Sequence, residues 1–125
     1  MTVFDRILKE IPERLVLRTP VKRKLFKIES VKPDKLVFSV GAKGTLIPIP
    51  KAIWNDIPNF LRGGDWIMIG ARYDVAPEKS LQEFIDHHPS RGTQHSSDAN
   101  YVASVLEYLK IVDVKRSGTS KVRLK

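Results

Sequence analysis

The spacing of the apolar residues changes near Pro50, and this change constrains the fold more than any other feature of the chain. Before Pro50, apolar residues alternate with other residues over positions 36–40 and 45–49. Such a period of two is typical of β-strands that bury one face. After Pro50, apolar residues recur every three or four positions, first over residues 50–61, which is the spacing of an amphipathic helix. We therefore expect an α+β protein.

Residues 1–49 are expected to form a helix followed by a three-stranded antiparallel β-meander. The apolar residues of segment 3–11 have helical spacing, so a helix is expected over residues 2–10. Pro33-Asp34 favours one chain reversal and residues 41–44, with two glycines, favour the next. The three strands are expected at residues 24–31, 35–40 and 45–49.

Residues 50–125 are expected to form a second unit, on which residues 1–49 pack. Its second helix should begin at Ser80-Leu81-Gln82-Glu83, which matches the Ser-x-x-Glu capping box. Gly118 lies in a polar stretch that should form the tip of a hairpin. The expected elements are a helix at 50–61, a short strand at 65–71, a helix from 81, a loop at 89–97, a helix at 97–109, and strands at 111–115 and 121–125.

This order of elements over about residues 50–125 resembles the winged helix-turn-helix family of DNA-binding domains. The resemblance is carried by the order and the lengths of the elements, without a diagnostic motif. In that family the third helix presents its outer face to the major groove, and the hairpin, called the wing, contacts the backbone or the adjacent minor groove. The resemblance therefore implies that helix 97–109 and the C-terminal hairpin contact DNA.

The positive charge of the chain is concentrated in two blocks. The net charge is +8, from 22 basic and 14 acidic residues. Residues 18–35 hold seven basic and two acidic residues, and residues 110–125 hold six basic residues and one acidic residue. Two such blocks suit surfaces that bind a polyanion. The alternative is that they are only solvated strand edges, whose charges prevent aggregation.

Residues on the third helix and the wing are the expected contacts to double-stranded DNA. Asparagine can pair with an adenine edge, hydroxyl groups donate to phosphate oxygens, and lysine and arginine neutralise phosphates. The predicted DNA-binding residues are Arg91, Gln94, His95, Asn100, Tyr101, Ser104, Lys115, Arg116, Lys121, Arg123 and Lys125. An additional basic patch, which would extend the footprint, consists of Lys22, Arg23, Lys24 and Lys27.

These helix residues also have simpler interpretations. Tyr101 and Tyr108 could pack against the wing or the second helix. Asn100 and Ser104 could lie on a solvated helix face. In the wing, Val122 and Leu124 should face inward while the neighbouring basic residues face solvent, because side chains alternate along a strand.

No metal, cofactor or enzymatic activity is expected. The chain has no cysteine, which excludes disulfides and cysteine-based zinc sites. The one cluster of potential metal ligands combines Asp86-His87-His88 with His95 and Asp98. Adjacent histidines on a helix point about 100 degrees apart, which does not favour a shared site. Pro33-Asp34 and Asp113-Val114-Lys115 resemble pieces of restriction-type nucleases, but the elements between them do not follow the order of that core.

The expected function is DNA binding, as a transcription regulator or another DNA-reading module. The alternative is a non-catalytic adaptor subunit, in which the apolar stripe of residues 3–11 docks on a partner or on a second copy. RNA binding is less favoured, because the meander shows no paired aromatic residues for stacking bases. No apolar stretch approaches the roughly 18 residues of a membrane span, and the N-terminal residues lack the pattern of a signal peptide, so a cytoplasmic location is expected.

Overall fold

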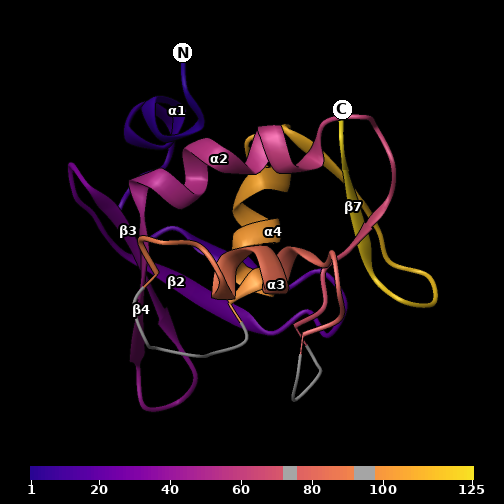
Figure 1. Cartoon of the computed structure of the whole chain (residues 1–125). Helices are drawn as coiled ribbons and strands as arrows, with labels where there is room; N and C mark the ends of the chain where they lie inside the picture. Colours follow the sequence, from indigo (N-terminus) through magenta and orange to yellow (C-terminus); the bar gives the residue numbers. More distant parts are fainter. Residues whose placement is uncertain (72–75, 92–97) are drawn as a thin grey trace.

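A computed structural model describes residues 1–71, 76–91 and 98–125, and these residues form an α+β structure (Figure 1). The helices are α1 (Val3–Glu10), α2 (Lys51–Leu61), α3 (Leu81–Asp86) and α4 (Ala99–Tyr108). The strands are β1 (Val16–Arg18), β2 (Leu25–Val31), β3 (Lys35–Val40), β4 (Thr45–Pro50), β5 (Ile67–Met68), β6 (Val112–Lys115) and β7 (Lys121–Leu124). The expected α+β class is confirmed.

The N-terminal sheet has four antiparallel strands in the order β1-β2-β3-β4. The expected meander of three strands is therefore wrong by one strand. The additional strand β1 pairs with β2 in the register Val16↔Lys27, Leu17↔Phe26 and Arg18↔Leu25. β1 has only three residues, so alternation alone does not identify it. Pairing with β2 stabilises this short strand instead.

A smaller antiparallel sheet with the order β5-β7-β6 contains the C-terminal hairpin, which we define as residues 112–124. The two strands that were expected in this hairpin are confirmed, and their ends differ from the expected ones by no more than a residue. β5 is shorter than expected, because only Ile67 and Met68 pair with β7, at Val122 and Lys121. Beyond them, the backbone turns at Gly70, which has a positive φ.

Helix α4 lies at the centre of the molecule (Figure 1). It contacts β1 on one side and β6 on another, and it also packs against α3. Six of its ten residues are buried, including Val102, Val105 and Leu106. The hydrophobic core extends continuously from these residues to the large buried side chains Phe38 and Trp54. Segments 1–49 and 50–125 therefore share one core.

The apolar stripe of α1 is buried within the same chain. Val3, Phe4, Ile7 and Ile11 all belong to the core, where α1 packs on α2. The backbone N–H of Phe4 donates to Asn55 Oδ1 at 2.9 Å. Most of this stripe is therefore buried, while Leu8 is 48% exposed. Docking of residues 3–11 on a partner stays a prediction.

The winged-helix assignment stays a prediction, because the confirmed features are the α+β class and the two antiparallel sheets. No helix in the described ranges of the chain combines the length and the apolar character needed to cross a membrane.

Candidate nucleic-acid interface

Part of the α4 face that was expected to contact DNA is packed inside the protein. Ser104 is only 5% exposed, and its Oγ donates to the carbonyl of Arg18 at 2.8 Å. The Tyr101 ring packs against Phe26 and Phe38, with centroid distances of 5.0 and 5.9 Å. The expected exposure is wrong for Ser104, which β1 covers, and the Tyr101 ring is only partly exposed beside β2. For Tyr101, packing was the alternative interpretation, although its partners lie on the N-terminal sheet.

Three other predicted residues lie before α4. The Arg91 side chain is buried and forms an ion pair with the buried carboxylate of Asp98. Its guanidinium also donates to the carbonyl of Pro48 at 3.5 Å. Arg91 is therefore a structural residue in the core, not an exposed DNA contact. Gln94 and His95 lie outside the described residues.

The C-terminal hairpin carries basic residues on one face, as the alternation predicted. Val122 is fully buried, while Lys121 and Arg123 on either side of it are partly exposed. In the β6–β7 register, Lys115 lies directly opposite Lys121, and Asp113 lies opposite Arg123. Like charges directly opposite each other on neighbouring strands lower stability. The Lys115–Lys121 pair is thus a local electrostatic cost that an anionic ligand would relieve.

Trp66 belongs to this basic face, and the sequence did not point to it. The Arg123 guanidinium lies 4.4 Å from the centroid of the Trp66 ring, and Lys115 Nζ lies 6.0 Å from it. The ring is partly exposed. An aromatic ring among cations is a common feature of nucleic-acid-binding surfaces. In the sequence, Trp66 stood within a short apolar run, and only the pairing of β5 with β7 places it beside Arg123.

Two carboxylates offset part of the hairpin charge. Glu107 forms an ion pair with Arg116 at 2.6 Å, and Asp113 lies 3.6 Å from Arg123 and 3.9 Å from Lys125. Most of the side chains in these ion pairs are about 40% exposed or more, so each ion pair contributes little to stability. Lys115 and Lys121 have no ion pair among the residues that the structure describes.

The second basic block meets the hairpin at a loop of residues 19–24, the 19–24 loop. The Arg116 Nε donates to the carbonyl of Pro20 at 2.9 Å and joins the two segments. The loop is closed by Thr19, whose N–H donates to the Lys24 carbonyl at 2.9 Å and whose Oγ1 accepts from the Lys24 N–H at 3.0 Å. Arg23 has a φ of +55° at its turn. The loop therefore holds a defined shape against the hairpin.

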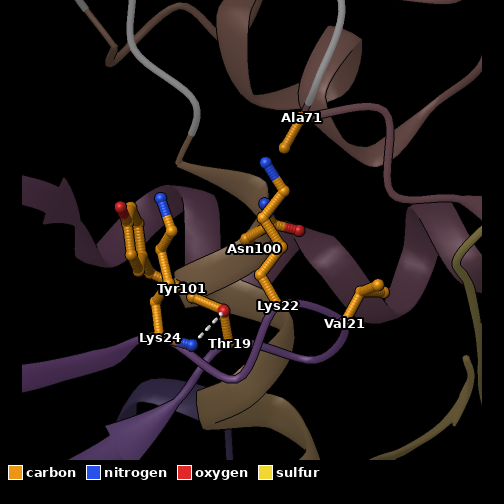
Figure 2. Close-up of a pocket in the computed structure, with 7 residues that line it drawn as sticks. All are labelled: Thr19, Val21, Lys22, Lys24, Ala71, Asn100 and Tyr101. Atoms are coloured by element: carbon orange, nitrogen blue, oxygen red, sulfur yellow. Dashed lines mark hydrogen bonds between the residues drawn. The ribbon is translucent and has the colours of Figure 1, made fainter.

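Two adjoining depressions lie between these segments. The first, of about 450 Å³, is lined by Thr19, Val21, Lys22, Lys24, Ala71, Asn100 and Tyr101 (Figure 2). The second, of about 330 Å³, is lined by Val21, Gly70, Ala71, Asn100, Gly118, Thr119 and Ser120. Because they share Val21, Ala71 and Asn100, they form one continuous groove. Its lining, as far as the chain is described, contains two lysines and no carboxylate.

The side chains of Lys22, Lys24 and Tyr101 extend in the same direction in the first depression, and the Asn100 amide appears beside Lys22 in this view (Figure 2). Burial raises the pKa of the Tyr101 hydroxyl from its ordinary value of 10.0, and the nearby negative charge of Asp98 raises it further. The hydroxyl therefore stays protonated at neutral pH and can donate a hydrogen bond.

The other two residues of the predicted basic patch, Arg23 and Lys27, do not line this groove. Lys27 lies between the buried Phe26 and Ile28 on β2, so it faces away from the core on the outer side of the sheet. Arg23 lines a separate depression beside Tyr108, which is 45% exposed. The predicted patch of four basic residues is thus divided, and two of the four reach the groove.

The cluster of potential metal ligands is not assembled in the described residues, where no group of three or more histidine and acidic side chains could hold a metal ion. His88 Nε2 instead lies 2.7 Å from Asp56 Oδ2, and His88 Nδ1 accepts from the backbone N–H of Ser90 at 3.1 Å.

Comparisons of the chain with protein-family models, with curated proteins and with solved structures gave no match.

Proposed function

We propose that this protein binds DNA through the sugar-phosphate backbone, with the C-terminal hairpin and the 19–24 loop acting as one basic surface. The supporting observation is that the two basic blocks, about a hundred positions apart in sequence, are in direct contact, since Arg116 donates to the Pro20 carbonyl. Most hydrogen bonds from proteins to DNA reach phosphate and sugar, and lysine and arginine supply many of them. A transcription regulator or another DNA-reading module would use such a surface.

In this proposal the hairpin corresponds to the wing, and α4 packs against its strand β6. Because Ser104 and Tyr101 are packed against the N-terminal sheet, they do not enter the major groove. Affinity then comes mainly from Lys115, Lys121 and Arg123, and depends little on base sequence. Trp66, beside Lys115 and Arg123, would come close to the bound strand.

The test is a titration of a fluorescently labelled DNA duplex at several salt concentrations. We expect the logarithm of the affinity to fall linearly with the logarithm of the salt concentration, by about 0.9 for each phosphate that is neutralised. The double variant Lys121→Gln/Arg123→Gln should bind about tenfold more weakly and show a shallower salt slope. Intrinsic fluorescence gives a second measurement, because Trp54 is fully buried and Trp66 is the tryptophan that a ligand can reach.

The matched control is Lys9→Gln/Lys43→Gln, which removes the same charge from α1 and from the β3–β4 turn. It should change the affinity less than about twofold, since long-range interactions between exposed charges are screened at physiological salt. Equal losses in the two double variants, or an affinity that does not respond to salt, would contradict the proposal. The second of these results would favour the adaptor function. Single-stranded DNA and duplex RNA of the same length test which nucleic acid binds best.

A further inference from the structure

The groove between the 19–24 loop and the start of α4 differs in chemistry from the open face of the hairpin. Its first depression combines the ammonium groups of Lys22 and Lys24, the amide of Asn100 and the hydroxyl of Tyr101 (Figure 2). All four groups can donate hydrogen bonds, and two are cations. A phosphate group, which offers several acceptor oxygens and negative charge, complements this set.

We propose that this depression binds a single phosphate group that carries a sugar, and that the adjoining depression receives that sugar. The inference rests on the proposed function, because it assigns one nucleotide unit of the bound strand to a defined position. The second depression holds the hydroxyls of Thr119 and Ser120 beside the small residues Gly70 and Gly118. An uncharged surface with hydroxyl groups suits a sugar rather than a second phosphate.

Several contacts hold the groove in this shape without a ligand. The two hydrogen bonds between Thr19 and Lys24 close the loop and present both lysines on the same side. Gly70 has a φ of +75°, and a Cβ at this position would lie 2.6 Å from Ser80 Cβ. Only glycine allows the floor of the groove to approach α3 so closely. A site that exists before the ligand arrives loses less entropy on binding.

The electrostatic environment also favours an anion. Lys22 and Lys24 have no ion pair within the described part of the chain. Asp98, the carboxylate directly before α4, is buried and paired with Arg91. The positive end of the α4 dipole adds a smaller attraction at Asn100. The Tyr101 hydroxyl is protonated at neutral pH and can donate, and burial raises its pKa further above the ordinary value of 10.0.

The experiment is an NMR titration of the isotope-labelled full chain with three probes: inorganic phosphate, adenosine monophosphate and a short DNA oligonucleotide. The Asn100 side-chain amide and the backbone amides of the 19–24 loop report on the groove. We expect these signals to shift with the nucleotide and with the oligonucleotide. The oligonucleotide should bind more tightly and displace the nucleotide, because it adds the contacts of the hairpin.

The test variant is Lys22→Gln/Lys24→Gln, and the matched control is Lys27→Gln/Lys32→Gln, which removes the same charge outside the groove. The first should weaken binding of the nucleotide and of DNA about tenfold, since each charge-assisted hydrogen bond contributes substantially to affinity. The control should change either affinity less than about twofold. All four lysine side chains lie at the surface, and unchanged spectra of the free variants would show that the fold is intact.

The outcomes separate this inference from the proposed function. If DNA binds with a salt-dependent affinity but the Asn100 amide does not respond, the phosphate site is wrong and the proposed function stands. If the nucleotide shifts the Asn100 amide but no DNA binds, the phosphate site is supported with free nucleotide as its source, and the proposed function is wrong. Equal effects of the two double variants would overturn the phosphate site.

Discussion

Helix α4 and the C-terminal hairpin follow each other directly along the chain, but they meet different surroundings. Six of the ten α4 residues are buried, because β1, α3 and β6 surround the helix. The hairpin buries one face through Val122 and leaves Lys115, Lys121 and Arg123 on the other. Helix α4, at the centre of the fold, can therefore only support the basic surface. The C-terminal hairpin keeps one face free and can present its charges to a ligand.

The largest expected effect separates the buried helix from the exposed hairpin tip. Ser104→Arg should lower the free energy of unfolding by about 3 kcal/mol, because the larger charged side chain replaces a buried hydroxyl. Thr119→Arg, at the exposed tip of the hairpin, should change it by less than about 0.5 kcal/mol. Urea unfolding followed by circular dichroism measures both. Similar stabilities of the two variants would mean that α4 is accessible after all.

The contact between the hairpin and the 19–24 loop can be broken at Arg116. Arg116→Ala removes the hydrogen bond to the Pro20 carbonyl and the ion pair with Glu107, and should cost about 1 to 2 kcal/mol of stability. The amide signals of the 19–24 loop should shift in the NMR spectrum. Arg62→Ala is the control, because the Arg62 side chain is exposed and makes no hydrogen bond among the described residues. A stable variant with an unmoved loop would show that the two segments are positioned independently.

A smaller effect should reveal a conflict between stability and binding on the hairpin itself. Lys121→Glu replaces a like-charged pair with an opposite-charged pair across from Lys115, and should raise the free energy of unfolding by about 0.5 kcal/mol. The same change should weaken DNA binding more than Lys121→Gln does. Thermal unfolding and the salt titration measure the two quantities. If Lys121→Glu lowers stability, the Lys115–Lys121 pair does not carry the electrostatic cost that we assign to it.

The smallest expected effect concerns the pH dependence of stability at Tyr101. Because its pKa is raised in the folded state, the folded protein keeps this proton when the unfolded chain has lost it. The corresponding stabilisation is complete below the ordinary pKa of 10.0 and is lost as the pH rises through the folded pKa. Tyr101→Phe should therefore lose less stability above pH 10.0 than the unchanged protein does, in urea unfolding measured at several pH values. Parallel curves would exclude a raised pKa.

Local patterns in the sequence predicted most of the fold. The apolar period, the Pro33-Asp34 turn and the capping box at Ser80 located the strands β2 to β4 and the helices, and Ser80 Oγ indeed accepts from the Glu83 N–H. β1 was missed because three residues contain too little alternation, and its stability depends on pairing with β2. A strand of this length depends on tertiary context more than on its own sequence.

The candidate site was predicted less well, because it depends on which surfaces are covered. The basic density of the hairpin was visible in the sequence, and its alternation correctly assigned Val122 to the interior. The burial of Ser104 and Arg91 was not visible, since it results from β1 and from the Asp98 carboxylate. The groove was also hidden, because its lining comes from four segments that are far apart in the chain, including Lys22 and Asn100.

The buried ion pair between Arg91 and Asp98 encloses the six residues 92–97 between two fixed points of the core. Two anchors in the core make the length of the sequence between them easy to change, since the free-energy cost of closing a chain segment grows only slowly with its length. The segment is thus a natural position for exchange: foreign sequences of different length could be grafted between the two anchors while α3 and α4 keep their places.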